Sequence, residues 1–367
     1  MNDYQAATNV NDKIRAKFES ILDKGRNSAV ETMTRLESER PNDRIVNTKA
    51  FKFKPNNTGL IVDVDGDEFH VHKHALNQAV GKTGVLGQTT VRKLMETGKP
   101  WARELAADML NKTYENVERD RLLIRSVGNQ VRGVLSDKYR RMDSGPIFES
   151  FIQATQEFGC LPTDGRSLDT KSTLTMSLPH VFEPIPNEPL GMVLFGATLS
   201  NSDYGDGALS LKFAMLRIWC TNMCMRDEVI RKIHLGKRLA DNVKFSEKTY
   251  MLDTETQASA VKDLIAGFLA PARVNEEMDR VRKAAEEAVD VKDVFQILYR
   301  KNSITKAEKN ELIDVYNTPD VEMLPPGNNL WRASNAVSLF AQKEGVTDYR
   351  AVELQNLAGD MLDAVAV

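Results

Sequence analysis

Hydrophobic residues recur at helical spacing near both ends of the chain. In residues 1–40 the apolar positions stand among many charged side chains, which is typical of a long polar helix. These apolar positions are Leu22, Val30, Met33 and Leu36. From about residue 253 onward the spacing predicts helices throughout, with a break at Pro271 and a last major helix that starts near Leu330. Thr305, followed three residues later by Glu308, predicts a capping box at a helix start.

The middle of the chain changes to strand-like patterning. In residues 171–185, Leu174 and Met176 alternate with polar side chains, which predicts a strand with one buried face and one wet face. Two further segments are mostly apolar and are expected to be central strands. The predicted strands cover 131–136, 171–185, 190–200 and 207–220, and the predicted helices cover 144–159 and 221–239. The middle of the chain therefore has the expected order β–α–β–β–β–α.

A smaller unit is expected between the N-terminal helix and this region. Asp65-Gly66 separates two runs of alternating hydrophobic residues, which predicts a tight hairpin. A helix should begin near His74, and residues 87–119 read as helical with a break at 97–100. Trp101 starts an apolar stripe at helical spacing in this part of the chain.

These elements together predict the α+β class. An antiparallel central sheet is flanked by the hairpin-and-helix unit on one side and by a helical C-terminal part on the other. The expected divisions are a helical arm over 1–45, a hairpin-plus-helices unit over 46–120, the central core over 121–250 and a helical region over 251–367.

Charge and cysteine content limit the partners and the cellular compartment that can be expected for the protein. The 367 residues carry a net charge of −3, so any attraction to nucleic acid must come from local basic patches. The three cysteines are too few for a disulfide framework, which favours reduced thiols inside a cell. No segment has the length and apolarity of a signal peptide or of a membrane span, so no membrane partner is expected.

Sequence motifs for catalysis, metals and nucleotides are incomplete. Residues 63–69 resemble a calcium loop but have Glu68 where glycine is required, so a hairpin turn is favoured. Alternating His70, His72 and His74 could bind a metal, although a solvated strand edge is the preferred interpretation. Gly81-Lys82-Thr83 lacks the earlier glycine of a phosphate-binding loop. We therefore predict no catalytic residue, no metal and no cofactor.

The basic segment 131–142, VRGVLSDKYRRM, is the main candidate for nucleic-acid binding. Strand alternation would place Arg132, Lys138 and Arg140 on one face, where they could contact phosphates. The same alternation sends Tyr139 to the other face with Val131 and Leu135, so Tyr139 could stack on a base only if it faces outward. The alternative interpretation is a solvated strand.

Other basic residues could extend this surface. Residues upstream of the segment, Arg119, Arg121 and Arg125, are expected on a helix. Downstream, the segment 225–248 is rich in lysine and arginine and could form the second wall of a groove, or simply a solvated helix face. The complete candidate set for binding nucleic acid is Arg132, Lys138, Tyr139, Arg140, Arg141, Arg231, Lys232, Lys237 and Arg238.

Three segments resemble a family of uncharacterised phage and plasmid proteins. These are LIRSVGNQVRGVLSDKYRRMD, LFGATLSNSDYGDGALSLKFAMLRIWCTNMC and NLWRASNAVSLFAQKEG, within residues 55–345. The order of a β-rich sheet followed by a long helix is also similar to single-strand annealing proteins such as Redβ and RecT, an analogy of element order alone. These resemblances imply a protein of a phage or mobile element that acts in the cytoplasm of its bacterial host.

The resemblance to annealing proteins implies binding of single-stranded DNA during recombination or replication, without ATP, by a homo-oligomer. A second hypothesis is a host-takeover or anti-defence protein that binds a host protein, which the acidic balance and helical C-terminal part would suit. A third, an enzyme such as a nuclease, would require distant carboxylates to converge in the fold.

Overall fold

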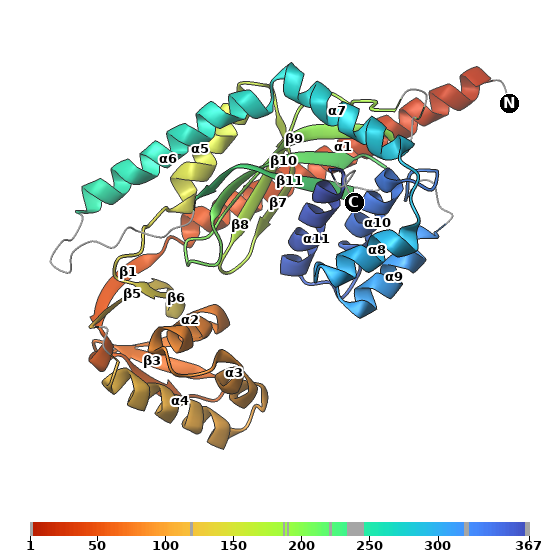
Figure 1. The fold of residues 1–367 in the computed structure, drawn as a ribbon. Helices are drawn as coiled ribbons and strands as arrows, with labels where there is room; N and C mark the ends of the chain where they lie inside the picture. The colour runs from red at the N-terminus through yellow and green to blue at the C-terminus, as the bar shows by residue number, and fades with distance from the viewer. Residues whose placement is uncertain are drawn as a thin grey trace.

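A computed structural model of the chain describes residues 3–117, 120–185, 188, 191–219, 222–232, 246–318 and 323–363. Within these ranges it contains two β-sheets and flanking helices, and the predicted α+β class is confirmed (Figure 1). Figure 1 shows the two sheets apart from each other, with the C-terminal helices gathered beside the five-stranded sheet. No helix in the described ranges has the length and apolar character needed to cross a bilayer.

The bounds of the helices and strands follow the chain order. The helices are α1 (Asp3–Ser38), α2 (Lys73–Thr83), α3 (Gln88–Glu96), α4 (Pro100–Glu115), α5 (Ser144–Gln156), α6 (Glu247–Phe268), α7 (Pro271–Glu286), α8 (Val291–Arg300), α9 (Lys306–Tyr316), α10 (Leu330–Phe340) and α11 (Asp348–Met361), with a 3-10 turn η1 (Thr48–Ala50). The strands are β1 (Asn42–Asn47), β2 (Lys52–Pro55), β3 (Leu60–Val64), β4 (Asp67–Val71), β5 (Arg121–Val127), β6 (Gln130–Ser136), β7 (Leu161–Ser167), β8 (Ser172–Ser177), β9 (Val193–Asn201), β10 (Leu209–Arg217) and β11 (Asn222–Lys232).

The first sheet has six strands in the order β1-β5-β6-β4-β3-β2. Its β3–β4 hairpin turns at Asp65 and Gly66, whose φ angles of 53° and 94° give the tight turn that the sequence predicted. The helix expected around Arg125 is wrong, because this residue lies in β5, which pairs with β1 and β6. The sheet thus takes strands from both sides of the expected division at residue 120.

Helix α4 packs on this sheet with a face about 100° around the helix from the predicted apolar stripe, because the buried positions each follow a stripe position by one residue. Ala102, Ala106 and Leu110 are fully buried, and α4 closes a core that includes the sheet residue Phe53. Trp101 is 57% exposed and lies on the solvent side. Small alanines bring the helix close to the sheet, and this close packing leaves the larger residues of the stripe outside.

The second sheet has five antiparallel strands in the order β11-β10-β9-β8-β7. The predicted strands over 171–185, 190–200 and 207–220 are confirmed as β8, β9 and β10. The predicted order of elements is not reproduced. Residues 131–136 form β6 of the other sheet, and β7 and β11 complete the five strands.

The helix predicted for 221–239 is wrong over 222–232, where the chain forms β11. The apolar residues that indicated a helix include Met225 and Val229, four positions apart. A spacing of four also satisfies the two-residue period of a strand, so the pattern alone could not decide. The segment forms a strand because it pairs with β10, from Leu209 opposite Lys232 to Arg217 opposite Asn222.

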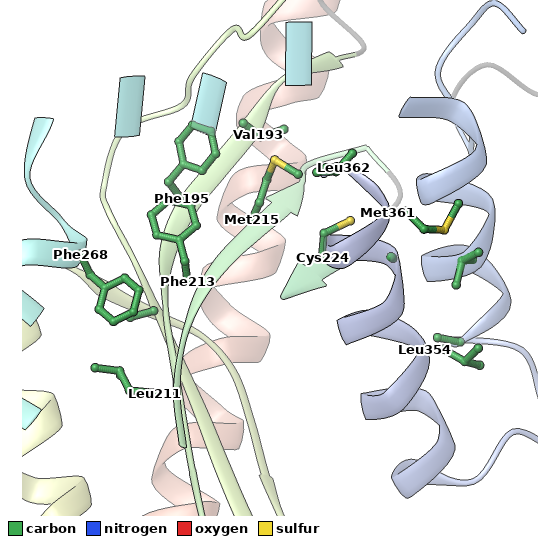
Figure 2. Close-up of a cluster of buried hydrophobic side chains, with 14 of the residues drawn as sticks. Val193, Phe195, Leu211, Phe213, Met215, Cys224, Phe268, Leu354, Met361 and Leu362 are labelled. Atoms are coloured by element: carbon green, nitrogen blue, oxygen red, sulfur yellow. The ribbon is translucent and has the colours of Figure 1, made fainter. Parts of the chain in front are cut away.

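One face of the second sheet holds the main hydrophobic core. Figure 2 shows Phe195 of β9 and Phe213 of β10 side by side, with Phe268 of α6 facing them. The ring centroids of Phe195 and Phe213 are 5.5 Å apart, and those of Phe213 and Phe268 are 6.3 Å apart. Leu174 and Met176 of β8 are buried in the same core, as their alternation predicted.

The opposite face of this sheet is covered by α1 and α11. Helix α1 touches β7 almost backbone to backbone: a Cβ added at Gly165 would lie 2.7 Å from the carbonyl oxygen of Ser28. On α11, a Cβ added at Gly359 would lie 2.0 Å from the carbonyl oxygen of Met225 in β11. These glycines fix the positions of both helices. The N-terminal segment, expected as an arm, packs on the sheet through Phe18 and Ile21.

The C-terminal part is helical, as predicted. Thr305 and Glu308 form the predicted capping box of α9, and α6 and α7 are separated just before Pro271. Helix α10 is followed by α11, which lies in the region predicted to be helical but was not identified as a separate helix. Thr347 caps it, and Ala351, Leu354 and Ala358 recur at helical spacing.

Candidate functional site

Arg132 is committed to a network inside the protein. Its side chain is buried in β6 and donates from Nη1 to the Glu39 carboxylate at 2.5 Å. Arg35 of α1 binds the same carboxylate at 2.9 Å and also Asp169 at 2.5 Å. Arg132 therefore links the first sheet to the end of α1 and to the turn between β7 and β8.

The basic residues that follow do not continue the strand. Strand β6 ends at Ser136, so the alternation expected for Lys138 and Arg140 does not apply. Arg140 forms a bidentate ion pair with Asp253 of α6, in which Nε and Nη2 each donate to one carboxylate oxygen. Lys138 is partly buried in the turn after β6, where its backbone N–H donates to the Ser136 hydroxyl at 3.3 Å.

Two further candidates in this segment also face protein groups. Arg141 lies 3.1 Å from the Asp43 carboxylate, with its guanidinium 4.7 Å from the ring centroid of Tyr250. Tyr139 is only 9% exposed and packs with Leu123 and Leu135. The prediction that Tyr139 stacks on a base is therefore wrong, because a ring buried in this cluster is not accessible to a base.

The second basic segment is placed only in part. Arg231 and Lys232 lie in β11, opposite Ser210 and Leu209 of β10. Lys237 and Arg238 lie outside the described residues. Among the basic residues whose side chains the structure describes, Arg132, Arg140 and Arg141 each face a different acidic partner within the protein.

The alternating histidines have separate partners. His72 lies 3.4 Å from Asp169, His74 lies 3.6 Å from Asp206, and His70 contacts the Asn56 amide at 3.2 Å. Burial lowers the pKa of His72 and outweighs the opposing effect of Asp169. Across the described ranges, no three histidine, cysteine or acidic side chains are grouped so that they could hold a metal ion.

A buried polar junction joins the two sheets. Arg125 is 1% exposed and donates to the carboxylates of Asp43 at 2.7 Å and Asp143 at 2.6 Å. It also donates to the carbonyl of Asp203 at 2.6 Å, and the Asp203 carboxylate accepts from the backbone N–H and hydroxyl of Ser144. Burial raises the pKa of Asp203 to about 6 against the opposing charge of Arg125. Because these groups satisfy one another, the junction is structural.

A polar groove of about 280 Å³ lies on the face of the second sheet that carries α11. Its floor comes from β7, β8, β9 and β10, and its wall comes from α11 and the start of β11. The lining residues are Asp164, Arg166, Lys171, Thr173, Thr175, Thr198, Ser200, Gly207, Ala208, Ser210, Lys212, Met223, Met225, Val352, Gln355 and Asn356.

Strand register arranges the floor as two rows across the sheet. Residues at alternate positions face the same side, and register partners stand beside one another on neighbouring strands. The first row consists of Arg166, Thr173, Ser200 and Ser210. The second row consists of Asp164, Thr175, Thr198 and Lys212. Each row therefore combines hydroxyls with one cation, at opposite edges of the floor.

Part of the second row is occupied by internal contacts. The hydroxyls of Thr175 and Thr198 bond to each other at 2.8 Å, and Lys212 donates to the Asn356 side chain at 2.8 Å. Arg166 Nε lies 3.4 Å from the Asp164 carboxylate. Burial nevertheless raises the pKa of Asp164, with Arg166 opposing, so its negative charge is disfavoured compared with a solvated aspartate.

The first row and the wall present unpaired polar groups to the groove. Thr173, Ser200 and Ser210 make no side-chain hydrogen bond to any residue that the structure describes, and the same holds for Gln355. Ser200 is 8% exposed and Gln355 is 4% exposed. The polar atoms of these side chains still reach the solvent that fills the groove. Such groups are therefore suited to an occupant of the groove.

The groove has the chemistry of an anion site with an apolar end. Lysine, arginine and hydroxyl side chains are common donors to phosphate oxygens. Met223, Met225 and Val352 provide apolar surface beside these donors. The sequence interpretation identified Thr173 and Thr175 as the wet face of a strand, but the partners on β7, β9 and β10 depend on strand pairing.

The chain was compared with family models, with curated proteins and with solved structures. None of the three comparisons found a match.

Proposed function

We propose that the protein binds single-stranded nucleic acid in the groove over β7–β10. The observation that carries the proposal is the first row of the floor, where Arg166 stands in register with three unpaired hydroxyls. Phosphate oxygens would satisfy these donors. Single-stranded DNA is the expected ligand, because the resemblance to phage and plasmid proteins implies a mobile element, with recombination or replication as the setting.

The balance of charge in the groove supports a phosphate ligand. Arg166, Lys171 and Lys212 line it, against the single carboxylate of Asp164, whose ionisation is disfavoured by burial. The wider surface of an acidic chain would repel nucleic acid, so a local cationic groove is the arrangement that binding requires. Binding through phosphates should weaken as salt rises, because bound counterions are released.

The size of the groove supports a flexible single strand. A volume of about 280 Å³ is at the lower end of small-ligand sites, so one nucleotide unit at a time could enter. A strand whose bases are unpaired can direct a phosphate to the floor and a base to the wall. A rigid duplex would keep its bases stacked and paired inside the helix.

Fluorescence anisotropy with a labelled single-stranded oligonucleotide tests the proposal. Replacing Lys171 or Lys212 by glutamine should weaken binding about fivefold at 0.1 M salt and reduce the salt slope by about 0.7 for each phosphate that the variant no longer neutralises. Lys112→Gln is the matched control, because Lys112 is exposed on α4, away from the second sheet. Binding that does not respond to salt, or that falls equally in the control, would contradict the proposal.

A further inference from the structure

Helix α4 carries large apolar side chains on its solvent side. Trp101 is 57% exposed and Leu105 is 43% exposed. They are four residues apart, so their side chains are neighbours on one face of the helix, and Met109, the next position of this stripe, is partly exposed. Apolar residues that gather on an exposed face are a feature of surfaces that contact another molecule.

Two carboxylates flank the apolar residues of this face. Glu104 and Asp108 are exposed, and they lie three residues after Trp101 and Leu105 respectively. Neither carboxylate makes an ion pair with a residue that the structure describes. Their spacing of four residues corresponds to about 6 Å along the helix axis. Lys112, on the same face, lies one turn beyond Asp108, at the end away from Trp101.

Helix α1 has a hollow of the opposite charge. The hollow has a volume of about 440 Å³ and is lined by Lys13, Ala16, Lys17 and Ser20 of α1 and by Trp219, which follows β10. The two lysines are exposed and are also four residues, or about 6 Å, apart along the helix. Trp219 is 4% exposed and, with Ala16, supplies the apolar part of the lining. None of these five residues is acidic.

We propose that the α4 face of one copy of this chain docks in the α1 hollow of a second copy. The two carboxylates of α4 match the two lysines of α1 in charge and in spacing. Trp101 can then enter the hollow beside Trp219, and pairs of aromatic rings pack favourably edge to face or offset. A symmetric contact of the α4 face with itself would instead set its carboxylates against one another, which is unfavourable.

The positions of the two surfaces require contact between copies. In Figure 1, α4 lies at the bottom of the view and the N-terminal half of α1 lies at the upper right, at the other end of the molecule. A contact between two different surfaces is head to tail, and it repeats into a ring or a filament. None of the residues involved lines the groove over β7–β10, so this inference and the proposed function can fail separately.

Sedimentation velocity of the full chain measures the association. Because each contact uses little more than one helix face, we expect a weak interface with a dissociation constant of about 1–100 μM. The average mass should therefore rise with protein concentration at about 0.05 M salt, and about 0.5 M salt should weaken the association at least about threefold by screening the charges. A wild-type protein that stays monomeric at about 100 μM in low salt would overturn the inference.

Charge reversal tests whether the two surfaces pair with each other. Glu104→Lys with Asp108→Lys, or Lys13→Glu with Lys17→Glu, should weaken association at least about tenfold, because like charges then face each other across the contact. An equal mixture of the two double variants brings opposite charges together at every contact, so it should assemble about as tightly as wild type. A mixture that stays monomeric would overturn the pairing.

Two further variants separate specific contacts from general effects of charge. Glu255→Lys with Asp263→Lys, on the exposed side of α6, changes the net charge as much as the reversal on α4 and should assemble like wild type. Trp101→Ser keeps every charge but removes the ring, and should weaken association at least about tenfold. Assembly that persists in the charge-reversed variants and in Trp101→Ser would mean that another surface joins the copies, and would overturn the inference.

Discussion

Asp203 offers a test of the buried junction between the two sheets. This residue is 8% exposed, and its carboxyl group accepts two hydrogen bonds from Ser144. In Asp203→Asn, the amide oxygen can accept the same two bonds, but the side chain can no longer ionise. The substitution therefore removes one titration and keeps the local geometry.

The pKa of Asp203 sets the direction and size of the effect. Burial raises this pKa from 3.8 to about 6, so the folded protein holds the proton more tightly than the unfolded chain. The stability contributed by Asp203 is therefore highest below pH 3.8 and falls as pH rises to about 6. The total loss is up to about 3 kcal/mol, at 1.36 kcal/mol per pKa unit. The asparagine variant does not carry this penalty.

Urea unfolding of wild type and Asp203→Asn at a series of pH values measures the effect. The free energy of unfolding of the variant minus that of wild type should rise by up to about 3 kcal/mol between about pH 4 and pH 6.5, then level off. Asp65→Asn, in the exposed β3–β4 turn, serves as a control for loss of a carboxylate. A difference that does not change with pH would refute the reasoning, because it would mean that Asp203 has the same pKa in both states.

Two further substitutions test other parts of the structure. Arg140→Gln should lower the free energy of unfolding by about 0.5–1 kcal/mol, since the pair with Asp253 is partly exposed, and should leave oligonucleotide affinity unchanged. A loss of affinity equal to that of Lys212→Gln would instead restore segment 131–142 as the binding surface. Gly359→Ala should cost about 1–3 kcal/mol, measured by urea unfolding, because its Cβ would meet the Met225 carbonyl at 2.0 Å; an unchanged midpoint would mean that α11 does not rest on β11.

The sequence correctly predicted those elements whose local residue pattern is compatible with only one kind of secondary structure. The alternation of Leu174 and Met176 identified β8, and Asp65-Gly66 identified the hairpin turn. The local pattern failed to predict elements whose secondary structure depends on contacts with distant parts of the chain. Strand β7 contains Pro162 and Gly165, which are poor strand residues, yet pairing with β8 and the close approach of α1 form the strand.

The candidate site was harder to predict than the fold. The basic run near Arg140 was visible in the sequence, but the acidic partner Asp253 lies more than a hundred residues away and neutralises it in the folded chain. The groove has the opposite character, because its cations are scattered singly along the chain. Only strand register brings Arg166, Ser200 and Ser210 into one row, and register follows from pairing that a single sequence does not reveal.

The seating of α1 on β7 has a consequence for synthesis of the protein. Helix α1 leaves the ribosome before β7, since Gly165, against which Ser28 rests, follows roughly 140 residues later. At about 5–20 residues per second, the nascent chain must wait roughly 7–28 seconds before that strand exists. During this interval the apolar side chains Phe18 and Ile21 have no sheet residues to pack against. A nascent chain that stops before β7 should therefore be a substrate for chaperones and proteases, which gives the cell a means of discarding incomplete copies.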